Sequence, residues 1–239
     1  MAVEISVIIP ALNEEKYISN ALDGLRKQTF RDFETIVVDG GSTDRTRELA
    51  GKGARVIILR RRGAGRARNA GARIAKGRIL VFIDADTVPS RKLLRAYSDI
   101  MKDSGIVAAT GPIYPLERSG WKYARGYRLV SVYFVRLSML LGRPAFVGSN
   151  FAVRKSAFEK ARGFNVSMMS YEDWELSNRL KRQGRMAYSS AATVTACVPK
   201  RATSRGAAIE PATKPTLAGA NTVPAVSAST PSPVCNSRA

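Results

Sequence analysis

Short apolar runs alternate with segments of helical periodicity over the first half of the chain. The runs cover residues 5–10, 33–38, 55–59 and 79–83, and each is short and rich in β-branched residues, as buried strands are. Between the first two runs, Tyr17, Ile18, Ala21, Leu22 and Leu25 recur on one helix face. Strands that alternate with helices predict an α/β fold with a mostly parallel sheet and right-handed crossovers.

Polar residues predict where the first helices begin. Asn13 is expected to cap the first helix, with Glu14 and Glu15 placed in its first turn. Ser42 or Thr43 is expected to cap a short helix that runs to residue 50, and a further helix is predicted over residues 63–75.

The second half of the pattern is less regular. It predicts a helix over residues 90–102, strands over 106–110 and 146–153, and a helix from 171 to about 183. Between them, residues 121–141 are apolar but interrupted by Arg125, Arg128 and Arg136, which argues against a membrane span. An interfacial amphipathic helix and a helix packed on its own domain are the two interpretations of this segment.

The character of the chain changes after Tyr188. No aromatic residue follows, and six of the eleven prolines fall within residues 199–233. Such a segment buries too little apolar surface to offset its ordering entropy. We therefore expect one catalytic domain over residues 1–188 and a disordered, low-complexity tail over residues 189–239, for which a shifted reading frame is one hypothesis.

The amino-acid composition excludes several classes of catalytic and metal site. The chain of 239 residues contains no histidine, which excludes Ser-His and Cys-His catalysis and His-bearing zinc sites. Its two cysteines are far apart, and its first residues show no secretory signal, so a cytoplasmic location is expected. The net charge of +20 favours anionic partners without specifying which, and residues 60–78 carry eight basic side chains and no acidic one.

Acidic residues follow two of the predicted strands. Asp84 and Asp86 come directly after residues 79–83, and Asp39 follows residues 33–38. Ligands of open α/β sheets bind outside the carboxyl ends of the strands. We therefore expect a ligand site at this edge, and the pair of carboxylates there favours a cation.

The series of motifs resembles the inverting glycosyltransferases of family 2, which have the GT-A fold, a Rossmann-like, mostly parallel central sheet flanked by helices. The resemblance spans roughly residues 3–188. It rests on the order of several short segments rather than on any one of them. These are residues 6–15, 37–44, 67–71, 82–86, 148–150, 163–164 and 172–173.

The resemblance implies a nucleotide diphosphate sugar, a UDP- or GDP-sugar, as the donor. It implies that Asp86 binds Mg²⁺ or Mn²⁺, a hard cation suited to carboxylate and phosphate oxygens, and that Asp84 lies near the ribose or a metal-bound water. Asp39 would contact the nucleotide base, although Gly40 stands where many relatives carry a second aspartate. The remaining donor-binding residues would be Pro10, Ala11, Glu14 and Arg68.

By the same resemblance, Asp173 is the general base, with Glu172 beside it. Both acids also stand in the first turn of a predicted helix, where the helix dipole favours them in any case. A base is needed to remove the proton of a hydroxyl, whereas a lipid phosphate is already an anion. The expected acceptor is therefore a hydroxyl of a glycan or lipid-linked molecule, with peripheral contact to the cytoplasmic membrane face as a further expectation.

Two alternatives share some of these features. A sugar nucleotidyltransferase would use a similar sheet, aspartate pair and basic loop. A non-catalytic nucleic-acid-binding module would explain the positive charge, but it leaves the acids at the strand ends unexplained, and aromatic residues are sparse in the basic stretch. No specific nucleic-acid partner is therefore expected.

Overall fold

A computed structural model describes residues 3–60, 63–115, 132–142, 144–168 and 171–196. By its internal contacts the chain divides into a compact unit, Met1–Val198, and the segment Pro199–Ala239. The predicted tail lies outside the described residues except for its first part.

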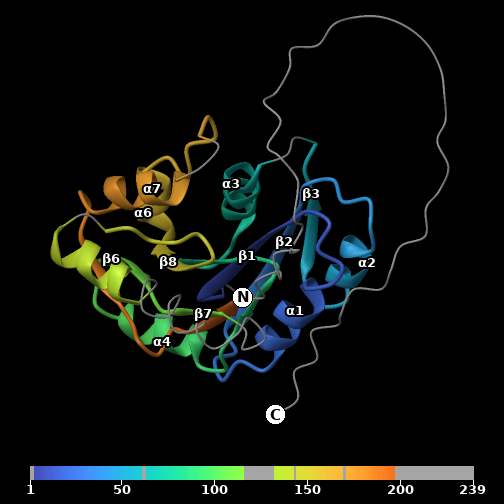
Figure 1. Cartoon of the computed structure of the whole chain (residues 1–239), viewed down its shortest axis with the longest axis horizontal. Helices are drawn as coiled ribbons and strands as arrows, with labels where there is room; N and C mark the ends of the chain where they lie inside the picture. The colour runs from blue at the N-terminus through green and yellow to red at the C-terminus, as the bar shows by residue number, and fades with distance from the viewer. Residues whose placement is uncertain (1–2, 61–62, 116–131, 143, 169–170, 197–239) are drawn as a thin grey trace, which may run out of the picture. The chain divides into compact units, whose positions relative to one another are not determined.

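A seven-stranded sheet forms the centre of the compact unit (Figure 1). Its order is β3-β2-β1-β4-β8-β6-β9. The strands are β1 (Ile5–Ala11), β2 (Phe33–Asp39), β3 (Arg55–Ile58), β4 (Ile79–Ile83), β6 (Ile106–Thr110), β8 (Asn150–Arg154) and β9 (Arg185–Tyr188). Only β8 runs antiparallel to its neighbours β4 and β6. The predicted mostly parallel α/β architecture is confirmed.

A small second sheet has the order β5-β10-β7. It consists of β5 (Thr87–Pro89), β7 (Ile113–Pro115) and β10 (Val194–Ala196). The last strand pairs antiparallel with β5, the strand that directly follows the Asp84–Asp86 turn. The described structure thus continues past Tyr188, the expected end of the domain.

Helices cover both faces of the central sheet (Figure 1). They are α1 (Ile18–Arg26), α2 (Thr46–Gly51), α3 (Ala64–Ile74), α4 (Leu93–Ile100), α6 (Lys155–Lys160) and α7 (Glu172–Leu180). On one face, Val7 and Ile9 pack with residues of α1 and α4. On the other, Ile8 packs with residues of α3, α6 and α7. The alternation along β1 therefore separates two apolar cores.

Four phenylalanines organise the second core. The Phe82 ring of β4 lies 4.9 Å from that of Phe151, 5.5 Å from that of Phe158 and 5.3 Å from that of Phe164. Aromatic pairs at such separations add about 0.5–1.5 kcal/mol each beyond their buried area. The cluster fixes the loop that carries Phe164 against the strand that ends at Asp84.

The prediction for the first helix is wrong at its start. Asn13 does not cap α1, which begins at Ile18 without a side-chain cap. Instead, Asn13 has a φ of 57°, donates its N–H to the Ser42 hydroxyl and accepts the Thr43 N–H on its side-chain oxygen. Its polar groups bridge the loops after β1 and β2, and this is why they are not available to the helix.

The predicted strand over residues 146–153 begins later than expected. The Asn150 N–H donates to the Val147 carbonyl, so the residues before Asn150 turn rather than extend. The Asn150 side chain is fully buried: it accepts the Tyr97 hydroxyl at 2.7 Å and donates to the carbonyls of Pro112 and Ala192. This asparagine therefore ties β8 to the second sheet.

Only the end of the mixed segment 121–141 falls within the described residues, as a helix over residues 132–140. Its buried side chains are Val135 and Ser138. Its exposed apolar side chains, with the following residue, are Tyr133, Phe134, Leu137, Leu140 and Leu141. No helix among the described residues is long and apolar enough to cross a membrane. Contact of this helix with a membrane surface stays a prediction.

Candidate functional site

A cavity of about 410 Å³ opens where β1, β2 and β4 end. It collects six of the predicted donor or metal residues, namely Pro10, Ala11, Glu14, Arg68, Asp84 and Asp86. The last two residues of β1 supply two of these, the loops after β1 and β4 supply three, and α3 supplies Arg68. The cavity lies at the sheet edge where the sequence placed it, because the carboxyl ends of neighbouring parallel strands meet there.

Asp39 is not among the residues that line this cavity. Its carboxylate is fully buried and accepts the N–H groups of Gly41 and Ser42, each at 3.0 Å. Arg47 adds a longer ion pair, with its Nε at 3.8 Å. The side chain thereby orders the turn that carries Gly40 to the cavity wall. A direct contact of Asp39 with a nucleotide base stays a prediction.

Negative charge is in excess inside the cavity. Burial raises the pKa of the Glu14 carboxyl from its ordinary 4.5 to about 7, and the charges of Asp86, Asp84 and Asp44 add to the rise. Burial, followed by the charge of Asp84, also raises the pKa of Asp86, and a hydrogen bond from Thr87 partly offsets this. A cation bound here would reverse these shifts, because it stabilises the ionised carboxylates.

The carboxylates of the cavity fit a cation that binds together with a substrate. Among the described residues, no group of three or more His, Cys, Asp or Glu side chains is arranged to hold a metal ion by itself. Mg²⁺ commonly takes only one or two protein carboxylates and completes its shell with phosphate and water oxygens. Asp84 and Asp86 can supply that share.

The raised pKa of Glu14 predicts a pH-dependent stability. Between about pH 4.5 and pH 7 the folded state retains a proton that the unfolded state releases, so this carboxyl lowers stability as the pH rises through that window. Glu14→Gln is therefore expected to raise the melting temperature at pH 8 and to change it little at pH 4.5. Thermal unfolding in EDTA across this range measures the effect. Glu159→Gln, at an exposed site on α6, is the control, and a Glu14→Gln curve parallel to the wild type at every pH would refute the prediction.

Arg68 joins the two halves of the site. Its guanidinium is buried and donates to Asp84 at 2.8 Å and to Glu172 at 3.2 Å. Asp84 follows β4, whereas Glu172 begins α7, so one side chain connects elements far apart in the sequence. The Arg68 Nε is buried without a hydrogen-bond partner among the described residues. Buried donors are rarely left unpaired, so this nitrogen is an exception within the described structure.

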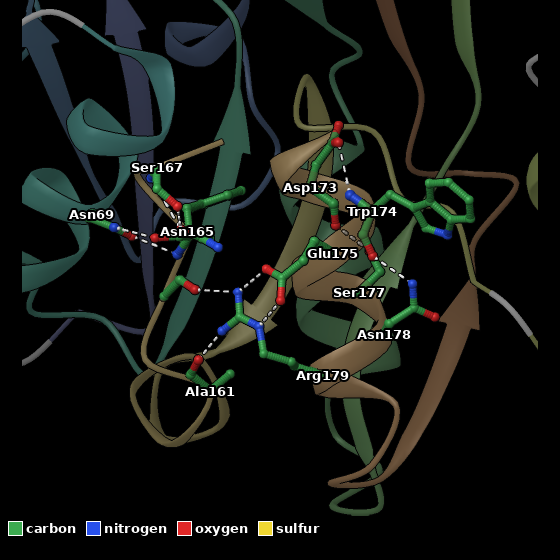
Figure 2. A network of polar contacts seen from close by, with 12 residues as sticks. Asn69, Ala161, Asn165, Ser167, Asp173, Trp174, Glu175, Ser177, Asn178 and Arg179 are labelled. Atoms are coloured by element: carbon green, nitrogen blue, oxygen red, sulfur yellow. Dashed lines mark hydrogen bonds and ion pairs between the residues drawn. The ribbon is translucent and has the colours of Figure 1, made fainter. Parts of the chain in front are cut away.

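Gly148 lies between Arg68 and the predicted base. A Cβ at this position would come within 2.8 Å of the Arg68 Nη2, so a larger residue would displace the guanidinium. The Gly148 N–H donates to Asp173 Oδ2 at 2.7 Å, and Asp173 Oδ1 accepts the Trp174 N–H. The backbone before β8 therefore orients one oxygen of the Asp173 carboxylate. The Trp174 N–H binds the other oxygen, and Figure 2 draws this bond as a dashed line.

Two further side chains hold the segment of residues 161–164 in place (Figure 2). Arg179 pairs with Glu175, with Nε 2.6 Å from Oε1, and donates to the carbonyls of Ala161 and Gly163. On α3, Asn69 donates to the Phe164 carbonyl and accepts the Phe164 N–H, each at 2.8 Å. Sequence reasoning missed both roles. Asn69 and Gly148 stood within motifs that were recognised, but no pattern marked Arg179.

The architecture has solved counterparts. Staphylococcus aureus TarS 1-349 in complex with UDP-GlcNAc superposes with a TM-score of 0.67 over 82% of this chain and 59% of its own, at 21% identity. The mannosyltransferase PcManGT from Pyrobaculum calidifontis, in complex with GDP-Man and Mn²⁺, gives 0.66 over 84% and 59%, at 24% identity. The fold is GT-A, as the sequence predicted.

The sequence profile of Glycosyl transferase family 2 matches residues 6–162, more than half of the chain. The chain therefore belongs to this family. Glycosyltransferase GlyG of Streptococcus pneumoniae is 29% identical over 122 residues, which are 48% of this chain and 40% of GlyG. TarS, a poly(ribitol-phosphate) β-N-acetylglucosaminyltransferase, is 35% identical over 99 residues, which are 38% of this chain and 17% of TarS. The chain thus spans less than half the length of these curated relatives.

Proposed function

We propose that the protein transfers a sugar from a UDP- or GDP-sugar to a hydroxyl of a glycan or lipid-linked acceptor, with inversion and with Mg²⁺ or Mn²⁺ bound. One observation carries the proposal: the cavity at the strand ends contains the Asp84–Asp86 pair, and Arg68 links it to the Glu172–Asp173 pair on α7. The ligands in the solved neighbours, UDP-GlcNAc and GDP-Man with Mn²⁺, support the same donor class and metal.

The donor half would bind the nucleotide diphosphate. Pro10 and Ala11 at the end of β1 and Glu14 after it line one wall. Asp86 would hold the cation, and Asp84 would lie near the ribose or a metal-bound water. That cation would neutralise the departing diphosphate as a Lewis acid. Arg68, which lines the cavity, would donate to an oxygen of the phosphates or the base.

The acceptor half would supply the base. Asp173 accepts the proton of the acceptor hydroxyl as the oxygen attacks the anomeric carbon from the face opposite the diphosphate. The new bond from the acceptor oxygen to the anomeric carbon forms as the bond from that carbon to the phosphate oxygen breaks, and its electron pair leaves with the diphosphate. A single displacement of this kind inverts the anomeric centre.

Binding of the donor tests this proposal directly. UDP- and GDP-sugars with Mn²⁺ are expected to raise the melting temperature, because a ligand of the folded state stabilises it by mass action. Asp86→Asn, which keeps the shape and removes the charge, is expected to weaken this metal-dependent binding by about tenfold or more, a loss of about 1.4 kcal/mol. Thermal-shift titration with and without EDTA measures it.

Asp99→Asn on α4 is the matched control, since Asp99 is exposed and pairs with Lys102 nearby. No stabilisation of the wild type by any nucleotide sugar would count decisively against the proposal. Product analysis separates the nucleotidyltransferase alternative: a glycosyltransferase releases nucleoside diphosphate, whereas a nucleotidyltransferase would release pyrophosphate or consume it.

A further inference from the structure

A second hollow lies along α3, beside the face that lines the catalytic cavity. Its volume is about 420 Å³, and its lining includes three arginines, Arg60, Arg66 and Arg73, and the apolar residues Leu59, Ala70 and Val166. Arg66, Asn69, Ala70 and Arg73 have the spacing of a single helix face. None of the residues of this hollow lines the catalytic cavity. The two are therefore separate, and they share only the helix between them.

The three arginines are not neutralised within the described part of the chain. All three are exposed, none of their side chains has an ion pair or hydrogen bond to another described residue, and no Asp or Glu lines the hollow. Elsewhere, Arg45, Arg78 and Arg185 each meet a carboxylate within 3 Å. Like charges that face one concavity repel each other and focus a positive potential inside it. An anionic ligand would relieve that repulsion.

We propose that this arginine hollow binds an acceptor chain that carries repeated phosphate groups. The inference rests on the proposed function and names the class of its acceptor. Guanidinium groups match phosphate oxygens with two parallel hydrogen bonds. Arg66 and Arg73 are two helical turns apart, about 10 Å along the axis. One phosphate cannot span that distance, whereas successive phosphates of a polymer can.

The hollow is connected to the predicted base through the first turns of α3. Asn69, in its wall, binds the backbone of Phe164. Gly65, one turn earlier, lies against both Phe164 and Glu172, since a Cβ there would be 3.4 Å and 3.7 Å from their side chains. A chain bound along Arg73 and Arg66 therefore leads toward the start of α7, where Asp173 lies.

Other anionic ligands fit less well. No aromatic side chain lines the hollow, so it offers no stacking surface for the bases of single-stranded nucleic acid. A lipid surface meets protruding rather than concave faces, and the exposed apolar side chains of residues 132–141 are not part of this hollow. The diphosphate of the donor has its own place beside Asp84 and Asp86.

Charge removal tests the proposal. The probe is fluorescently labelled inorganic polyphosphate, titrated by anisotropy in EDTA against the full chain. Arg66→Gln/Arg73→Gln is expected to lower its affinity by about tenfold or more and to reduce the salt dependence by about two counterions, because two phosphate contacts are lost. Arg55→Gln/Arg91→Gln removes the same charge from exposed sites outside the hollow and is expected to lower the affinity less than threefold.

Other results of these titrations would contradict the proposal. Equal losses in the two double variants would overturn the arginine hollow as a site. So would a loss confined to single-stranded DNA or to phosphatidylglycerol vesicles, used as parallel probes. Donor binding with Mn²⁺ should be unchanged in Arg66→Gln/Arg73→Gln. If no nucleotide sugar stabilises the wild type, the proposed function fails and the acceptor role fails with it, even where polyphosphate binding depends on the arginines.

Discussion

Asp173→Asn is expected to lower the rate of sugar transfer by about 10²–10⁴-fold, the usual contribution of a general base. The asparagine oxygen can still accept the Gly148 N–H, so the start of α7 should keep its place. Donor binding should persist, because Asp173 does not line the donor cavity. Single-turnover transfer and a nucleotide-sugar thermal shift, measured on the same preparation, separate the two effects.

The acceptor used in that assay decides what the result means. With a hydroxyl acceptor, the loss should appear in kcat and not in donor affinity. Transfer to a polyprenyl phosphate that continued undiminished in Asp173→Asn would contradict a hydroxyl acceptor, because a phosphate needs no proton removed. Asp23→Asn, at an exposed position on α1, should transfer at the wild-type rate.

Arg68→Met is expected to affect stability and transfer together. Methionine keeps an apolar stem beside Phe164 but leaves Asp84 and Glu172 without their shared cation. Removing one partner of a buried ion pair costs about 3–5 kcal/mol, and the 36% exposure of the Asp84 side chain reduces the expected loss to about 2–3 kcal/mol. Misplacement of either carboxylate by about 1 Å would lower transfer by about 10²-fold.

A double variant distinguishes the loss of stability from the loss of transfer. Arg68→Met/Glu172→Gln removes the uncompensated charge of Glu172, so part of the lost stability should return, whereas transfer should not. Arg68→Lys keeps the charge but has no planar fork to reach both carboxylates, and we expect intermediate stability. Chemical unfolding and initial transfer rates supply the readouts. Arg68→Met with wild-type stability and wild-type transfer would show that the bridge has no role.

The sequence predicted the position of the cavity at the strand ends well because its signals are local. A β-branched run that ends in two acids predicts both a strand and the position of its end. β4, with Asp84 and Asp86 after it, lies where that pattern indicated. The helix that carries Arg68 was likewise expected over residues 63–75 and spans Ala64–Ile74. In both cases the residues that define the element are neighbours in the chain.

The sequence does not decide the outcome where a polar side chain has two partners available. Asn13 can cap a helix or bridge two loops, and the choice depends on Ser42 and Thr43, about thirty positions away. Asp39 can face a ligand or bind its own turn, and the N–H groups of Gly41 and Ser42 hold it there. The contact of Arg68 with Glu172, 104 residues later, has no local signal at all.

The reversed direction of β8 determines which loops can share one edge. Ile83 at the end of β4 pairs with Asn150 at the beginning of β8, so residues that enter β8 meet residues that leave β4. Were β8 parallel, its leading loop would lie at the opposite edge of the sheet, about 16 Å away for a strand of five residues. Asp84 and Asp86 thus follow a strand that ends at this edge, whereas Gly148, whose amide orients Asp173, precedes a strand that begins there. The single antiparallel strand β8 therefore brings both segments to the same edge of the sheet.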